Sequence, residues 1–259
     1  MKYSLVFFGF ILAIHPVSSF AQTNFKNWNT AQLTFAFSKK LDLRLSHLRA
    51  FDLTNGFKSD FNQSGVQLRY DLTRKIDLAS GYVFSGSNSL ADGGSRVFTR
   101  VGYKIRLAKV LSWSNSLQGE IHDKNENRYH YRIIWNTRLS PRKRLDFLNL
   151  SPSISYSLFY NIGGSPIRYY DKIGTVIASN TPDGFHRGRL MLSLNSKVAQ
   201  NFSVSLYYMH QQEFNLFTND LKEINVINPV TGKVTRRFDN YNVAGLTLAY
   251  DINLYKKKK

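Results

Sequence analysis

Arginine and lysine side chains recur at alternate positions through several stretches of this chain. In the stretch from Arg128 to Arg138, arginines at 128, 132 and 138 alternate with aromatic and aliphatic residues. Guanidinium groups bind carboxylates and phosphates through paired hydrogen bonds, and rings of such groups select anions. If the side chains at these alternate positions, which we call one parity of the strand, all face a common interior, that interior is basic. The residues expected to line it are Arg69, Arg100, Lys104, Arg106, Arg128, Arg132, Arg138, Arg187 and Arg189.

Carboxylates share this parity with the basic residues, so two interpretations of the interior remain open. In one, the basic side chains form an anion-attracting passage. In the other, arginines and carboxylates pair across neighbouring strands and close a narrow interior. The narrow width expected of a small barrel favours the closed state. The carboxylates concerned are Asp42, Asp71, Asp77, Glu120 and Asp251.

Histidine offers little evidence for catalysis or metal binding. His47 and His210 fall on the apolar parity, where a lipid hydrolase would place a serine–histidine pair, but no family signature accompanies either residue. His122-Asp123 and the segment 126–130 lack a recognised metal-ligand spacing. We therefore predict no catalytic residue, no metal site and no cofactor, and we expect the protein not to be an enzyme.

The elements that position these side chains are strands. About eleven segments alternate apolar and polar residues with period two, as in Tyr131, Ile133 and Trp135 against Arg132 and Asn136. The segments run about 9 to 12 residues, which suits a tilted strand that crosses a bilayer. The pattern predicts an all-β fold, a closed antiparallel transmembrane β-barrel. A secreted β-sandwich is the soluble alternative, and the strand length and aromatic content argue against it.

The connections between segments alternate in length. Short turns, such as 38–40 and 73–75, alternate along the chain with long loops. The longest loops are 161–184 and 213–240. Outer-membrane barrels have this asymmetry, with tight periplasmic turns and long external loops.

A total of eleven segments is odd, whereas bacterial outer-membrane barrels have an even number of strands. We therefore predict 12 strands, with 10 as the alternative. The segment 24–30 could rise through or along the barrel, or the hairpin-like stretch from Ile224 to Arg237 could supply a further strand.

The first 21 residues have the features of a secretory signal peptide. Lys2 precedes an apolar run and a small-residue site that ends at Ala21, which predicts a signal over residues 1–21 and a barrel over 22–259. The formal net charge of the chain is +18, and it contains no cysteine. A basic protein attracts anionic partners, but nucleic acid is not expected in the cell envelope. We expect the cell outer membrane as its location.

Aromatic residues near strand ends suit the membrane interface, where their rings lie among lipid headgroups. Tyr169 and Tyr170, in a long loop, could stack on carbohydrate, but loop packing is the better interpretation. The residues expected in the aromatic girdles are Trp113, Tyr129, Tyr131, Trp135, Tyr156, Tyr160 and Tyr208.

Four motifs carry a resemblance to a known family. They are Trp28, the strand Gly65-Val66-Gln67-Leu68-Arg69-Tyr70, the pair Gly81-Tyr82, and the run Arg128-Tyr129-His130-Tyr131-Arg132. With these the chain resembles an uncharacterised outer-membrane β-barrel family, domain of unknown function 2490. The resemblance implies location and architecture but brings no activity. The tail Lys256–Lys259 departs from the aromatic ending usual in such barrels.

These observations lead to one function hypothesis and two alternatives. The hypothesis is a small-solute or anion channel, or a structural component of the envelope. The alternatives are a lipid-modifying outer-membrane enzyme and a surface-binding protein that acts through its long loops. The expected partners are outer-membrane lipids and lipopolysaccharide, the barrel-assembly machinery and small anionic solutes.

Overall fold

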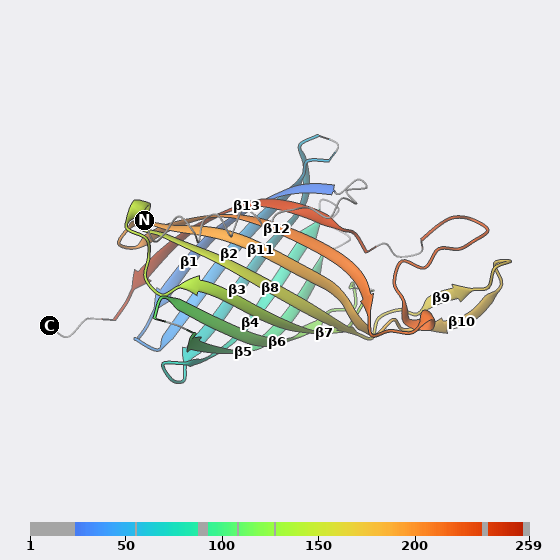
Figure 1. Cartoon of the computed structure of the whole chain (residues 1–259), viewed down its shortest axis with the longest axis horizontal. Helices are drawn as coiled ribbons and strands as arrows, with labels where there is room; N and C mark the ends of the chain where they lie inside the picture. Colours follow the sequence, from blue (N-terminus) through green and yellow to red (C-terminus); the bar gives the residue numbers. More distant parts are fainter. Residues whose placement is uncertain are drawn as a thin grey trace.

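The computed structural model describes residues 24–54, 56–87, 93–107, 109–126, 128–234 and 238–255. Within these ranges, eleven long strands form one closed barrel, and their common tilt is visible in Figure 1. The predicted signal peptide and Lys256–Lys259 lie outside the described residues. The barrel strands are β1 (Asn24–Ala36), β2 (Leu41–Asp52), β3 (Lys58–Asp71), β4 (Ile76–Ser87), β5 (Gly94–Arg106), β6 (Leu111–His122), β7 (Tyr131–Pro141), β8 (Leu150–Ile162), β11 (Gly184–Ala199), β12 (Phe202–Leu216) and β13 (Tyr241–Asn253).

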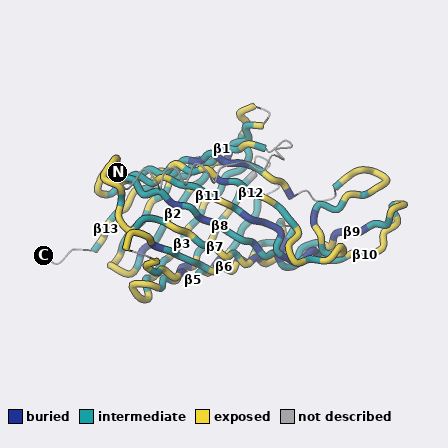
Figure 2. Tube along the Cα trace, viewed as in Figure 1, coloured by how far each residue is buried: buried dark blue, intermediate teal, exposed yellow. Residues whose placement is uncertain are grey.

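Alternation along each strand separates an apolar outer face from a polar inner face. In β12, Leu206 is 59% exposed on the outside, while the hydroxyl of its neighbour Ser205 accepts a hydrogen bond from Asn195 inside the barrel. In Figure 2 most of the barrel trace is intermediate or exposed, as expected for a wall one sheet thick. The predicted all-β closed barrel is confirmed. Large apolar side chains exposed on the outer face include Val66, Leu68, Val97, Val101, Leu117, Ile121, Leu190, Leu194 and Leu248.

The barrel closes by parallel pairing of its first and last strands. β1 pairs with β13 in parallel over thirteen positions, from Asn24 opposite Tyr241 to Ala36 opposite Asn253, and the other neighbouring strands pair antiparallel. A closed sheet with an odd number of strands must contain one parallel pair, because strand direction otherwise alternates. The predictions of 12 and 10 strands are therefore wrong for the described chain. The segment 24–30 belongs to β1 itself.

The stretch from Ile224 to Arg237 supplies no barrel strand in its described part. One isolated bridge joins Ile227 to Val234. The Asn228 side chain accepts hydrogen bonds from the backbone N–H groups of Val230 and Thr231 in a tight turn. Residues 235–237 lie outside the described ranges. An additional strand has no free edge here, because β12 and β13 already pair directly with each other.

The two ends of the barrel differ in their connections. We call the end at which four of the five connections have four residues or fewer the turn end, and the opposite end the loop end. The connections at the turn end are 37–40, 72–75, 107–110, 142–149 and 200–201. Those at the loop end are 53–57, 88–93, 123–130, 163–183 and 217–240.

Short elements occur in three of the connections. The 3-10 turns Phe147–Asn149 and Asp220–Lys222 and the hairpin of β9 (Ile167–Tyr170) and β10 (Val176–Asn180) lie outside the barrel wall. Tyr169 is buried, and its hydroxyl donates to the carbonyl oxygen of Glu223 at 3.2 Å, which joins the two longest loops. This is the loop packing expected for that tyrosine. No helix in the described ranges is long and apolar enough to cross a membrane.

Candidate functional site

Glu120 is a deeply enclosed carboxylate in the loop half of the barrel interior. Its side chain is 3% exposed, and its oxygens lie 3.4 Å from Arg96 Nε, 3.6 Å from Arg132 Nη1 and 2.9 Å from His122 Nε2. The strand register produces one of these contacts, because Glu120 on β6 lies directly opposite Arg132 on β7. One carboxylate thus serves two guanidinium groups, and this part of the interior keeps a positive excess.

A second buried pair lies across β11 and β12. Arg187 is directly opposite Glu213, and Arg187 Nε donates to Glu213 Oε1 at 2.5 Å. The amide of Gln211 donates to the same oxygen at 2.9 Å. Both partners of the ion pair are almost completely enclosed, so the pair is a fixed part of the wall and not a mobile surface contact.

Arg189 differs from these arginines because it forms no ion pair with a described carboxylate. Its Nε donates to Gln211 Oε1 at 2.7 Å, and its Nη2 donates to the Tyr241 hydroxyl at 3.1 Å. The guanidinium carbon lies 5.0 Å from the ring centre of Phe159 and 5.7 Å from that of Trp28. Two neutral hydrogen bonds and two aromatic faces hold this charge without neutralising it.

These residues form one group, which we call the loop-end cluster. It combines four arginines with two glutamates, so its formal charge is positive even if His122 is neutral. In a low-dielectric wall such an excess raises the local potential and favours anions. The cluster consists of Arg96, Glu120, Arg132, Arg187, Arg189 and Glu213.

Ion pairs of the turn half are more exposed to water. Arg69 Nη2 lies 2.9 Å from Asp42, its direct partner across β2 and β3, and Arg100 Nη2 lies 2.8 Å from Asp77. A cavity of about 450 Å³ opens among polar side chains at this end of the barrel. Its lining includes Gln32, Asp42, Arg44, Arg69, Lys197 and Asp251.

Of the nine basic residues expected in the interior, Arg128 lies outside the barrel strands. It belongs to the connection 123–130, where its Nε and Nη2 donate to the two oxygens of Glu126, each at 2.9 Å. Burial raises the pKa of Glu126, but the hydrogen bonds and charge of Arg128 outweigh this effect, so its pKa lies below the ordinary value. Lys104, Arg106 and Arg138 form no ion pair with a described carboxylate.

Tyr129 does not lie in an outer aromatic girdle, contrary to the prediction. Its side chain is buried, its ring meets that of His122 edge-on at 4.8 Å, and the Arg132 guanidinium carbon lies 3.8 Å from its ring centre. The physical reason is that β7 begins only at Tyr131, so the strand parity does not extend back to residue 129. Tyr131 and Trp135 are exposed on the outer face.

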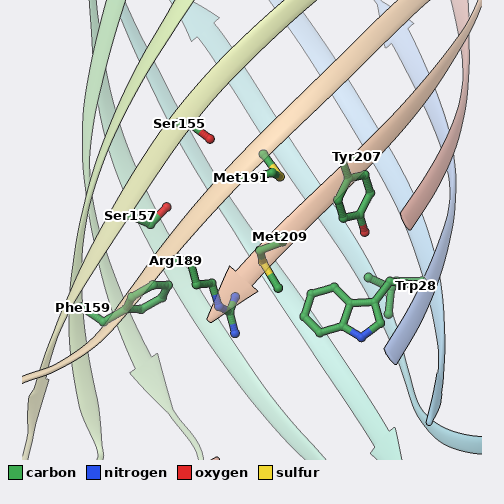
Figure 3. Close-up of a pocket in the computed structure, with 9 residues that line it drawn as sticks. Trp28, Ser155, Ser157, Phe159, Arg189, Met191, Tyr207 and Met209 are labelled. Atoms are coloured by element: carbon green, nitrogen blue, oxygen red, sulfur yellow. The ribbon is translucent and has the colours of Figure 1, made fainter. Parts of the chain in front are cut away.

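Sequence reasoning missed a cavity in the middle of the barrel, which we call the central pocket. Its volume is about 270 Å³, and Figure 3 shows the aromatic and sulfur-containing side chains that line it beside Arg189. Met191 and Met209 lie on the inner parity of β11 and β12, and these apolar residues at polar positions were the available signal. The lining consists of Trp28, Leu48, Ser155, Ser157, Phe159, Arg189, Met191, Tyr207 and Met209.

The two histidines of the outer face have separate partners. His47 Nδ1 lies 2.9 Å from the hydroxyl of Ser64, whereas His210 Nδ1 lies 2.8 Å from Asn242 Oδ1, which also accepts a hydrogen bond from Tyr208. A hydrolytic site would need a hydroxyl nucleophile and an orienting polar group at the same histidine. In the described ranges His47 has only the hydroxyl and His210 only the orienting amide. No group of three or more metal-ligating side chains occurs among those residues.

Fold and interior together define a closed β-barrel with a positive cluster in its loop half and a partly aromatic central pocket beside Arg189. The family described as "Protein of unknown function (DUF2490)" matches residues 25–222, and the chain belongs to this family. No curated protein matches the chain.

Two solved structures are similar to parts of this chain. The NanC porin shares 9% identity over 73% of this chain and 87% of its own, with a TM-score of 0.44. The outer membrane protein OprD from Pseudomonas aeruginosa shares 14% identity over 81% of this chain, with a TM-score of 0.32. The alignment covers 53% of OprD, so this chain corresponds to about half its length.

Proposed function

We propose that the protein is an outer-membrane channel for small anionic solutes. The observation that carries this proposal is the charge of the loop-end cluster, in which four arginines share two glutamates. Fixed positive charge in a narrow interior lowers the free energy of an anion relative to a cation of equal size.

The outer face supports the membrane part of the proposal. Its large side chains are apolar and exposed over most of the barrel, which is unfavourable in water and favourable against lipid tails. Barrel strands of 11 to 16 residues are long enough to cross a bilayer when tilted. Outer-membrane lipids and lipopolysaccharide are the proposed surroundings, and the barrel-assembly machinery is the proposed partner in folding.

The ion pairs determine where the charge lies. Glu120 and Glu213 hold Arg132 and Arg187 against the wall, so these guanidinium groups add potential without extending across the interior. Arg189 has no such partner and is the arginine of the cluster best able to meet a passing anion directly. Removing the Arg189 charge should therefore weaken anion preference more than removing a charge elsewhere.

The test is conductance of the purified protein in planar bilayers under a salt gradient. We expect discrete steps and a reversal potential on the chloride side, with Arg189→Gln lowering the anion-to-cation permeability ratio several-fold, on the order of 1 kcal/mol. The matched control is Arg74→Gln, which removes one exposed charge from the connection 72–75 and should leave the ratio unchanged. Cation preference in the unmodified protein, or no conductance at any voltage, would contradict the proposal.

Lipid modification is the second candidate function, and the observation in its favour is the contact between His47 and Ser64 on the outer face. A hydroxyl beside an imidazole can act as a nucleophile towards an ester. Hydrolysis of a phospholipid by the purified protein that is lost in both His47→Ala and Ser64→Ala would support this function. Hydrolysis that persists in either variant would remove the pair from consideration.

A further inference from the structure

We propose that the central pocket is a binding subsite for organic anions in which a carboxylate is attached to a flat apolar body. This inference deepens the channel proposal, on which it rests for the solute to reach the barrel interior. The relevant chemistry combines three features that lie together in Figure 3: apolar walls, one uncompensated guanidinium group and unused hydrogen-bonding groups.

Aromatic and thioether groups form the walls. Trp28 and Phe159 contribute aromatic surface, and Met191, Met209 and Leu48 contribute flexible apolar surface. Thioethers adapt to the shape of a partner and make favourable contacts with aromatic rings. A cavity of about 150 Å³ accommodates benzene in a protein interior, so about 270 Å³ has room for one ring with a carboxylate.

Arg189 supplies the recognition of charge. Its Nε and Nη2 are held by Gln211 and Tyr241, which fixes the plane of the guanidinium group, and its Nη1 has no hydrogen-bond partner among the described residues. An arginine oriented in this way loses little conformational entropy when it binds a carboxylate. The positive charge also disfavours cations in the same pocket.

Two further groups are available for hydrogen bonds to a solute. The indole Nε1 of Trp28 is buried without a hydrogen-bond partner in the described structure. The Ser155 hydroxyl also lines the pocket and makes no hydrogen bond to a described group. Buried donors without partners are unfavourable, so a solute oxygen that accepts from Trp28 would gain binding energy.

The same geometry discriminates between solutes. Acetate can use the charge of Arg189 but covers little of the apolar wall, whereas benzamide can use the wall but lacks the charge. Benzoate can use both features. We expect benzoate to bind about tenfold more tightly than either, since burying several additional apolar carbons or forming one charge-assisted contact each gives at least that factor.

The experiment uses the fluorescence of Trp28. The chain has three tryptophans, so the double variant Trp113→Phe/Trp135→Phe leaves Trp28 as the only one. Titration of this protein in detergent with benzoate should change its fluorescence emission saturably. The benzoate concentration at half-saturation should be about tenfold lower than that of acetate or benzamide. Equal half-saturation for the three compounds, or no change with benzoate, would overturn the inference.

Two further variants assign the site within this background. Arg189→Gln should remove the advantage of benzoate over benzamide, and Met191→Gln, which keeps the length of the side chain, should weaken benzoate but not acetate. Arg74→Gln is the matched control and should bind benzoate as the parent does. Unchanged benzoate binding in a folded Arg189→Gln barrel would overturn the assignment.

The outcomes for the subsite and for the channel can be separated. Anion-selective conductance without saturable benzoate binding would overturn the subsite and leave the channel proposal intact. Binding of benzoate that depends on Arg189, in a protein without conductance, would support the subsite and overturn the channel proposal.

Discussion

Glu120 and Arg132 lie directly opposite each other on β6 and β7, and both side chains are buried in the barrel interior. Arg96 approaches the same carboxylate from β5, so Glu120 on β6 is a shared counter-ion for arginines of the two flanking strands. Removing a shared counter-ion leaves two guanidinium groups of the wall without this counter-charge. The wall of the loop half therefore depends on this carboxylate more than on any one of its arginines.

Replacing Glu120 by glutamine should destabilise the barrel strongly. Arg132 would remain buried and Arg96 partly buried without this counter-charge, and we expect the free energy of unfolding to fall by about 3–5 kcal/mol. Denaturant unfolding in detergent micelles measures this change. Asp71→Asn is the control, because its contact with Arg69 is 3.8 Å long and exposed to water, and its loss should cost less than about 1 kcal/mol. Equal effects of the two changes would contradict the role of Glu120.

The parallel seam between β1 and β13 can be tested by cross-linking. Thr30 lies opposite Thr247, and the native chain has no cysteine. Neighbouring strands are about 4.8 Å apart, within disulfide reach, so Thr30→Cys/Thr247→Cys should form an intrachain disulfide on oxidation and migrate faster when denatured without reductant. Thr30→Cys/Ala249→Cys, two positions out of register, is the control. Cross-linking of the control but not of the first pair would exclude this register.

Gly245 provides space for the ring of Tyr207, its direct partner on β12. A Cβ atom at Gly245 would overlap the Tyr207 ring. We expect Gly245→Ala to push this ring into the central pocket, to lower the free energy of unfolding by about 1–3 kcal/mol and to weaken benzoate binding. Gly119→Ala on β6 is the control, because nothing lies within 4 Å of its added Cβ. Recovery of stability when Tyr207→Ser is added to Gly245→Ala would identify the ring as the cause.

Acid should loosen the connection 123–130. Arg128 holds the pKa of Glu126 below its ordinary value despite burial, so the pair stabilises the folded loop above the ordinary glutamate pKa of about 4.3. That contribution is lost as the pH falls through the lowered pKa. Hydrogen-exchange protection of the loop, corrected for intrinsic rates, should decrease there. Glu126→Gln should show the decreased protection already at neutral pH, and full protection in this variant would contradict the role of the pair.

The strands could be predicted because parity is a local property. The alternation of Leu206 with Ser205 is visible in sequence and correctly separates the outer from the inner face. The alternation no longer predicts which way a side chain points where the strand ends. Tyr129 precedes β7, and its ring turns inward and packs against the Arg132 guanidinium group. The register that places Glu120 opposite Arg132 depends on the length of the intervening loop, which the alternation alone does not specify.

The strand number and the central pocket could not be predicted, because both depend on closure of the sheet. Parallel pairing of β1 with β13 is a contact between the two ends of the barrel sequence, and no local pattern indicates its direction. Trp28, Phe159 and Met209 come from three separate strands and meet only in the closed barrel. Alternation places apolar residues on the outer face as a class and therefore does not indicate the apolar part of the interior.

The β1–β13 seam also has a consequence for how the barrel folds. Asn27 on β1 donates to the carbonyl oxygen of Ala244 on β13, and these residues are 217 positions apart. Hairpins elsewhere in the wall can form locally, whereas this pairing bears the largest loop-closure entropy of the sheet. The seam should therefore form last. Until it does, β1 and β13 present two unpaired edges, which is the stage at which incorrect pairing with another chain competes most strongly with closure.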